Sequence, residues 1–216
     1  MVFGKAITFD EENLTDAAST AGPTAFCSIE QPFLDRLRAG DADAFDNLVL
    51  RYSSDVYGLL CRLAGDREEA AELTQETFLS ALKGIGKFRG DSELKTWLFR
   101  IAVNHSRNRF RWWKRRRRDA TISLDAETGD FSRTVSETIA DRSASPEDNA
   151  MLAERSRRLK AALATLPDVY REAVVLCDVH GMTYEQIAVT LDVQMGTVKS
   201  RIARGREELR RKLTDF

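Results

Sequence analysis

Apolar residues recur every three or four positions along most of this 216-residue chain, which is the spacing of one face of an α-helix. No segment has the pattern of a credible β-strand. The first half of the chain is therefore expected to form four helices, the second of them capped by Asp43. Their expected ranges are about 33–40, 43–63, 67–83 and 92–113.

Helical spacing returns in the last third of the chain, after a stretch with few large apolar residues. A helix over about 149–165 is expected to stop at Leu166 and Pro167, and a central helix that contains Tyr170 and Leu176 follows. The predicted fold class is therefore all-α, with two small helical domains joined by a flexible acidic linker.

The final helices have the pattern of a helix-turn-helix over residues 183–209. Thr183 and Gln186 stand at the spacing of a capping box, in which each side chain bonds the other's backbone N–H. A short polar break at 192–194 precedes a second helix with cations and small hydroxyls opposite its apolar side. The major groove of DNA accepts such a helix. An ordinary antiparallel helix pair with a solvated charged face would show the same pattern.

Charge is unevenly distributed, although the formal net charge is only −1. Residues 83–118 carry thirteen Lys and Arg against two acids, and residues 199–212 carry seven against two. Residues 119–150 carry eight acids against two arginines. Two basic blocks divided by an acidic spacer indicate two surfaces that contact a polyanion.

Composition divides the chain into four parts. Residues 1–32 mix small polar residues, acids and prolines without periodicity, which indicates a mostly flexible extension. Residues 119–150 have the composition of a linker. The two helical domains are expected over 33–118 and 151–216.

The side chains that carry metal or catalytic chemistry are few and scattered. Cys27, Cys61 and Cys177 are odd in number and far apart, which fits neither a disulfide framework nor a zinc site. His105 and His180 have no partners at metal-ligand spacing. We therefore expect no catalytic residue, no metal and no cofactor. The chain shows neither a membrane-spanning apolar run nor a signal peptide, so a cytoplasmic protein without membrane insertion is expected.

The basic block at 87–118 interleaves cations with aromatic residues and amides. This mixture suits unpaired nucleic acid, because cations follow the phosphates, aromatic faces accept unstacked bases and amides read base edges. Trp97, Leu98 and Ile101 fit a core role better. The remaining polar residues recur at three- and four-residue spacing on one helical face and are expected to have no acidic neighbours: Arg100, Asn104, Arg107, Asn108 and Arg111.

Three segments together resemble one family. They are ELTQETFLSAL at 72–82, FRGDSELKTWLFRIAVNHSRN at 88–108 and TYEQIAVTLDVQMGTVKSRIARGREEL at 183–209. In this order and spacing they resemble the extracytoplasmic-function (group 4) sigma factors of the bacterial sigma-70 family, which are initiation subunits of RNA polymerase. The resemblance covers about 33–118 and 151–216.

The resemblance implies that residues 33–118 form region 2, which binds core polymerase and recognises and melts the −10 promoter element. The third helix would dock on the clamp helices of the β′ subunit, with an exposed phenylalanine beside carboxylates and an amide. The candidates for core binding are Glu72, Gln75, Glu76 and Phe78. The candidates for binding the −10 element and the melted strand are Lys87, Phe88, Arg89, Trp97, Arg100, Asn104, Arg107, Asn108 and Arg111.

Residues 151–216 would then be region 4, which reads the −35 element as duplex through the helix-turn-helix. The candidates for this contact are Thr183, Thr197, Lys199, Ser200, Arg201, Arg204, Arg206 and Arg210. The acidic linker resembles the connector that runs through the active-site channel of the polymerase. The expected partners are core RNA polymerase (β′ clamp helices and β subunit), promoter DNA and an anti-sigma factor, and the free chain is expected to be a monomer.

The alternative is an autonomous helix-turn-helix regulator with an amino-terminal sensor or dimerisation domain, but it leaves the cations at 83–118 unexplained. Two features depart from the family's pattern. The tract at 112–118 is unusually basic and aromatic. Gly205 lies inside the predicted recognition helix, where it costs about 1 kcal/mol relative to alanine, and close packing against the preceding helix is the expected reason.

Overall fold

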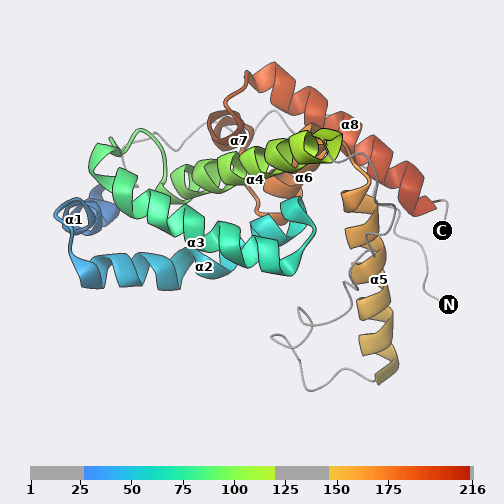
Figure 1. Ribbon diagram of the computed structural model, residues 1–216, viewed down its shortest axis with the longest axis horizontal. Helices are drawn as coiled ribbons and strands as arrows, with labels where there is room; N and C mark the ends of the chain where they lie inside the picture. Colours follow the sequence, from blue (N-terminus) through green and yellow to red (C-terminus); the bar gives the residue numbers. More distant parts are fainter. Residues whose placement is uncertain (1–26, 120–145, 215–216) are drawn as a thin grey trace.

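Helices account for all the regular structure in the part of the chain that the computed structural model describes, residues 27–119 and 146–214 (Figure 1). This confirms the all-α prediction. Two short segments with other helical geometry, the 3₁₀ turn Ile85–Lys87 and the π-helical turn Val175–Val179, continue α3 and α6. The α-helices are α1 Cys27–Arg38, α2 Ala42–Ala64, α3 Arg67–Gly84, α4 Leu94–Asp119, α5 Pro146–Ala164, α6 Asp168–Val174, α7 Tyr184–Leu191 and α8 Met195–Thr214.

Helices α1–α4 form the first unit, in which α2, α3 and α4 pack against one another. Their facing sides bury large apolar residues, among them Leu59, Leu73 and Phe99. Asp66 caps α3 by accepting a hydrogen bond from the backbone N–H of Glu69 at 2.7 Å. Core packing and capping thus agree on where these helices begin and which faces they bury.

Several helix boundaries differ from the sequence predictions. Asp41, rather than Asp43, caps α2, because its Oδ1 accepts from the Ala44 N–H, and Asp43 lies in the first turn. Helix α1 begins at Cys27, with Pro32 inside it, so residues 27–32 are helical. Helix α4 continues to Asp119, six residues beyond the predicted end. Arginine and lysine are good helix formers, so the basic tract extends α4.

Helices α5–α8 form the second unit, whose core includes Leu176, Ile187, Val198 and Ile202. The predicted central helix is α6 and its π-helical continuation, a change of winding that apolar spacing did not reveal. Gly181, with φ +63°, ends this segment in the left-handed region. The extension predicted over 1–32 and the linker predicted over 119–150 lie largely outside the described residues, and residues 146–150 of the latter belong to α5.

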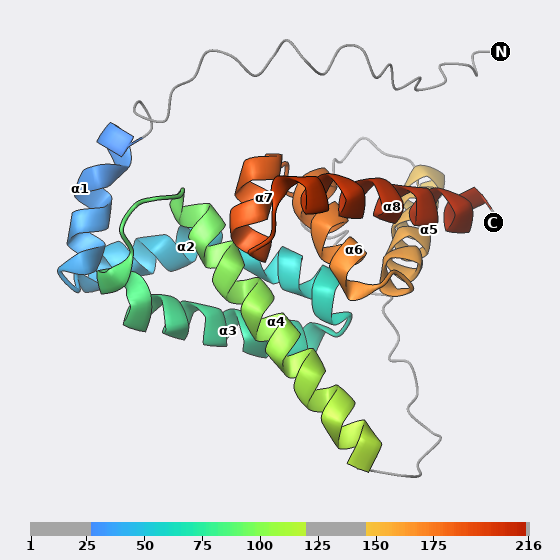
Figure 2. The ribbon, with the colours of Figure 1, turned by 90° about the horizontal axis from the view of Figure 1, so that it is seen from above.

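The two units pack against each other. Helix α4 lies against α7, and α2 contacts α5, α6 and the π-helical turn (Figure 2). The carboxyl-terminal end of α4 projects beyond the rest of the first unit, and α5 stands at the side of the molecule (Figures 1 and 2). We call this packing, in which α4 lies against α7 and Arg107 of α4 binds Glu172 of α6, the closed arrangement.

Candidate nucleic-acid and polymerase interfaces

The helix-turn-helix is built as the sequence predicts. The Thr183 hydroxyl accepts from the Gln186 N–H at 3.3 Å, and the Gln186 side-chain oxygen accepts from the Thr183 N–H at 2.9 Å, which confirms the capping box. Asp192 ends α7 in the left-handed conformation, with φ 57°. Buried Ile187 and Val198 hold the two helices together and leave the opposite side of α8 to solvent.

The solvent side of α8 carries polar and cationic residues. Lys199, Ser200 and Arg204 are exposed, and Thr197 is half-buried. The Ser200 hydroxyl donates to the Thr197 carbonyl at 3.0 Å, within its own helix. This exposed face has the size and chemistry of a recognition helix.

The other predicted duplex contacts have different surroundings. Arg206 binds Asp178 at the end of the π-helical turn, with an NH2–Oδ1 distance of 2.5 Å, and this bond raises the pKa of Arg206. Arg201 is half-buried, and its NH1 has no hydrogen-bond partner within the described part of the chain. Arg210 is exposed. The roles of these residues on DNA stay predictions.

Gly205 is the point of closest approach between α8 and α6. A Cβ placed on Gly205 would lie 2.5 Å from Cγ2 of Val174 and 3.3 Å from the carbonyl oxygen of Tyr170. Close packing therefore explains the glycine, as predicted. Its partner is α6 rather than α7, the helix directly before α8 in the chain.

One face of α4 is open to solvent along its length. Asn104, Asn108 and Arg111 are exposed and follow one another at four- and three-residue spacing. Arg111 donates to the Asn108 side-chain oxygen at 2.7 Å. The row is accessible to a ligand, and its role on unpaired DNA stays a prediction.

Arg100 and Arg107 are directed instead toward the second unit. Arg107 donates to both carboxylate oxygens of Glu172 in α6, at 2.8 and 2.5 Å, and to the Leu191 carbonyl oxygen at 3.3 Å. The Glu172 side chain is only 6% exposed, and the ion pair raises the pKa of Arg107. Arg100 lies 4.0 Å from Asp192. The expectation that this face lacks acidic neighbours was wrong, because the acids come from helices far away in sequence.

The aromatic residues near the start of α4 contribute to the core. Phe88 is 7% exposed and packs on the half-buried Trp97, with ring centroids 5.0 Å apart. This agrees with the core role that the sequence favoured for Trp97. Lys87 and Arg89, on either side of Phe88, are exposed. In the segment before α4, the buried Phe88 ring thus fixes the backbone, and the neighbouring Lys87 and Arg89 side chains extend into solvent.

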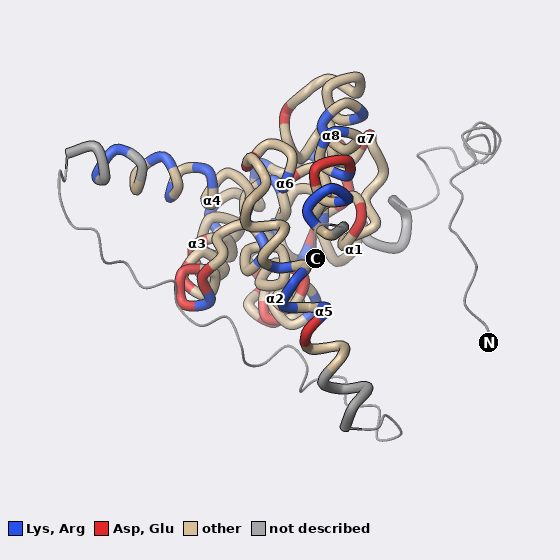
Figure 3. Tube along the Cα trace, turned by 90° about the vertical axis from the view of Figure 1, so that its right-hand side faces the viewer, with Lys and Arg blue, Asp and Glu red and all other residues tan. Residues whose placement is uncertain are grey.

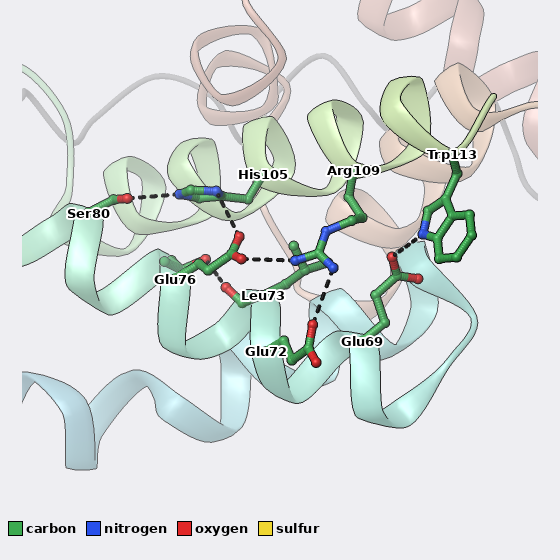
Figure 4. A network of polar contacts seen from close by, with 9 residues as sticks. Glu69, Glu72, Leu73, Glu76, Ser80, His105, Arg109 and Trp113 are labelled. Carbon is green, nitrogen blue, oxygen red and sulfur yellow. Dashed lines mark hydrogen bonds and ion pairs between the residues drawn. The ribbon is translucent and has the colours of Figure 1, made fainter. Parts of the chain in front are cut away.

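A polar network connects the exposed side of α3 to α4 (Figure 4). Arg109 binds Glu72 at 3.2 Å and Glu76 at 2.9 Å. His105 lies between Glu76 Oε2, at 3.4 Å, and the Ser80 hydroxyl, at 2.9 Å. Side chains of α4 therefore orient Glu72 and Glu76, two of the carboxylates predicted to bind core polymerase.

The prediction that α3 exposes the phenylalanine Phe78 was wrong. Phe78 is 7% exposed, because it lies on the side of α3 that faces the core. The apolar residues on the outer side are Leu79 and Leu82, which are 56% and 47% exposed. Leu79 is four residues from Gln75 and three from Glu76, so these residues share a face. On a helical wheel whose core side is defined by Ala70, Leu73 and Ala81, Leu79 lies nearly opposite the core and Phe78 lies at its border.

Within the described ranges, no three His, Cys, Asp or Glu side chains gather as metal ligands would. In the same ranges, no helix is both long and apolar enough to cross a bilayer. Cys61 and Cys177 are free thiols, and burial raises the pKa of Cys177.

Family comparisons agree with this geometry. Residues 48–118 match the family model described as Sigma-70 region 2, and residues 156–209 match Sigma-70, region 4. The "ECF RNA polymerase sigma factor SigW" of Bacillus subtilis is 35% identical over 182 residues, which cover 84% of this chain and 95% of that protein. The chain belongs to the ECF sigma factors of the sigma-70 family. It is an RNA polymerase sigma factor, and the alternative of an autonomous regulator is not favoured.

Further relatives of this ECF sigma factor extend over nearly the same residues. The RNA polymerase sigma-H factor of Pseudomonas aeruginosa is 35% identical over 181 residues, or 83% of this chain and 91% of that protein. The sigma factor RpoE of Bartonella quintana, solved with the anti-sigma factor NepR, has a TM-score of 0.60 and 25% identity, covering 79% of this chain and 96% of that one. CnrH, solved with the cytosolic domain of CnrY, shares the fold, with a TM-score of 0.62 at 22% identity over 86% and 97% of the two chains.

Proposed function

We propose that this sigma factor divides promoter recognition between two helices, each with one face open to solvent. Helix α8 reads the −35 element as duplex through Lys199, Ser200 and Arg204. Helix α4 holds the melted −10 strand along Asn104 and Asn108. The observation that carries the proposal is that both faces are polar and exposed on helices whose other sides are buried in a core.

The cations near these faces supply affinity without sequence preference. Lys87 and Arg89 contact phosphates at the start of α4, and Arg206 and Arg210 contact phosphates along α8. Contacts to phosphates release counterions, so the affinity for promoter DNA falls steeply with salt concentration. The protein acts as a non-catalytic subunit in the cytoplasm and contributes recognition and strand separation.

The outer face of α3 is the proposed contact with the clamp helices of the β′ subunit. It combines Glu72, Gln75 and Glu76 with the exposed Leu79 and Leu82. An apolar centre with a polar rim is the composition of a protein interface. Arg109 and His105 hold the glutamates in position, so this face is preorganised for a partner.

An anti-sigma factor is the proposed regulator. RpoE of Bartonella quintana was solved with an anti-sigma factor, which supports the same kind of control here. Leu50 of α2 is 78% exposed, and with Leu79 and Leu82 it offers apolar surface that a protein partner would cover. We expect the chain to be a monomer when neither this partner nor the polymerase is bound.

Run-off transcription with core polymerase tests the function as a whole. Core polymerase that initiates at the cognate promoter only when this chain is added is the expected result. Absence of core binding and of initiation by the wild-type chain would refute the proposal.

Asn104→Ala tests whether α4 contributes to holding the melted strand and not to duplex binding. The variant is expected to slow promoter opening by about tenfold and to leave closed-complex formation within about twofold, because Asn104 contacts only the separated strand. Permanganate footprinting measures opening, and gel retardation at low temperature measures closed complexes. Asn47→Ala, an exposed asparagine of α2, is the matched control. Normal melting in Asn104→Ala would exclude the proposed role.

A further inference from the structure

The carboxyl-terminal part of α4, residues 108–116, projects from the bundle and carries cations along the projecting helix (Figure 3). We call this segment the α4 tip. Three large aromatic residues in it are exposed: Phe110 by 51%, Trp112 by 41% and Trp113 by 48%. Trp112 and Trp113 contact each other and form an exposed apolar patch, and such patches mark surfaces that a ligand or partner covers.

Two of the aromatic residues are held by their neighbours. The guanidinium of Arg116 lies 4.5 Å from the centre of the Trp112 ring, and Trp113 meets Trp112 edge to face with centroids 5.1 Å apart. The Trp113 indole N–H donates to Glu69 of α3 at 3.2 Å. Trp113 therefore anchors the tip to α3, and Trp112 is oriented between the Arg116 and Trp113 side chains.

Trp112 lines an open pocket of about 460 Å³ beside α4. Asn108, Arg111 and Arg115 line the same pocket, each three or four residues from another on one helical face. Its volume falls within the roughly 300–1,000 Å³ of small-molecule sites. The pocket thus places an aromatic ring, an amide and the exposed guanidinium groups of Arg111 and Arg115 around one space, and Glu76, His105 and Arg109 complete its lining.

The charges around the pocket favour an anionic ligand. The acid that lines the pocket, Glu76, is already paired with Arg109 at 2.9 Å and lies 3.4 Å from His105. Arg111 and Arg115 are exposed beside it. A phosphate backbone with an unpaired base matches this set: the guanidinium groups bind phosphate, the indole stacks and the amide meets a base edge.

The pocket continues the face proposed for the melted strand. Asn104, Asn108, Arg111 and Arg115 succeed one another at spacings of four, three and four residues. In the closed arrangement the first unit still exposes all four side chains, whereas Arg107 is engaged by Glu172. The α4 tip is therefore accessible in the free chain.

We propose that the α4 tip is an additional binding site for unpaired DNA, in which one base stacks on Trp112 while Arg111 and Arg115 contact the flanking phosphates. The proposal rests on the proposed function, since it lengthens the single-strand surface of α4 beyond Arg111. It assigns a ligand to the tract at 112–118, whose basic and aromatic composition the family resemblance leaves unexplained.

The test uses the full-length chain and a single-stranded DNA of about ten nucleotides that carries one 2-aminopurine. Stacking on tryptophan quenches 2-aminopurine, a signal that a purely ionic contact does not produce. The wild-type chain is expected to quench it at one or two neighbouring positions of the label. Trp112→Leu is expected to abolish the quenching and to weaken affinity about tenfold. Arg115→Gln is expected to weaken affinity and to retain quenching at saturation.

Phe110→Leu is the matched control, because Phe110 is an aromatic residue exposed by 51%, against 41% for Trp112, on the same helix but does not line the pocket. Affinity within about twofold of wild type is expected for it. Equal quenching by Trp112→Leu and wild type would overturn the proposal. So would an equal loss of affinity for the corresponding duplex, or binding to anionic vesicles with no binding to DNA. Run-off transcription by the wild-type chain separates the two claims. If the wild-type chain initiates and Trp112→Leu shows the same quenching and affinity as wild type, only the α4 tip site is refuted. If the wild-type chain does not initiate, the sigma function itself is refuted.

Discussion

At the scale of single residues, His180 shows how contact between the two units sets the properties of a side chain. Its ring meets Phe99 of α4 edge to face, with centroids 4.9 Å apart. Burial lowers the pKa of His180 to about 4, the nearby Arg62 and Lys95 act in the same direction, and Asp55 opposes them. His180 is therefore neutral in the closed arrangement at neutral pH.

This lowered pKa predicts a loss of stability on acidification. The unfolded chain binds a proton at His180 below about pH 6.5, and the folded chain does so only near pH 4, so the stabilising contribution is complete above about pH 6.5 and falls between these values. We expect the free energy of unfolding to fall by about 1 kcal/mol more in wild type than in His180→Gln between about pH 7 and pH 5. Urea denaturation at both pH values measures this difference, and an identical pH dependence in the two proteins would contradict it.

Gly205 gives a prediction in which packing opposes helix propensity. Gly205→Ala gains up to about 1 kcal/mol of propensity but forces a Cβ to within 2.5 Å of the stiff Val174 side chain, and overpacking typically costs about 1–3 kcal/mol. A net loss of about 1 kcal/mol is therefore expected from urea denaturation. Gly196→Ala, in the first turn of the same helix with no atom within 4 Å of its Cβ, is expected to be neutral or stabilising. The prediction fails if both variants gain stability.

At the scale of elements, α7 depends on its cap because it is only 8 residues long. Thr183→Ala removes the side-chain acceptor for the Gln186 N–H and is expected to cost about 1 kcal/mol of unfolding free energy. Thr183→Ser keeps the hydroxyl and is expected to cost less than about half as much. Chemical denaturation compares the two, and equal losses would show that the methyl group, rather than the cap, stabilises α7.

The network between α3 and α4 belongs to the same scale. Side chains from one helix hold the glutamates of another, so the outer face of α3 cannot be understood from its own sequence. Arg109 lies 33 positions from Glu76 and 37 from Glu72. Apolar periodicity predicted both helices, although α4 ends six residues beyond its predicted end, but the pairs between the helices depend on how they cross.

At the scale of the whole molecule, the closed arrangement withholds part of the proposed −10 surface. Arg107 is bound by Glu172, Arg100 lies beside Asp192, and α7 covers the adjacent side of α4. Contact with a melted strand through these two arginines requires α4 to separate from α6 and α7. The free chain is accordingly expected to bind promoter DNA weakly.

Glu172→Gln tests this expectation. Loss of one partner from a buried ion pair leaves Arg107 uncompensated, so the variant is expected to open and to bind single-stranded −10 DNA about tenfold more tightly than the wild-type free chain. Small-angle scattering measures the increase in radius of gyration, and fluorescence anisotropy measures affinity. Glu208→Gln, which breaks an exposed pair with Arg211, is the control and is expected to change neither. An unchanged radius together with unchanged affinity would exclude the locking role of this pair.

The amino-acid sequence by itself determined most of the helical pattern, the capping box at Thr183 and the two basic blocks, because helical periodicity, caps and charge blocks are local patterns. It also indicated the family through three ordered segments. The tertiary structure alone decided that Gly205 meets Val174 and that Arg107 binds Glu172. Each of these depends on how helices distant in the chain cross and pack, and no local pattern carries that geometry.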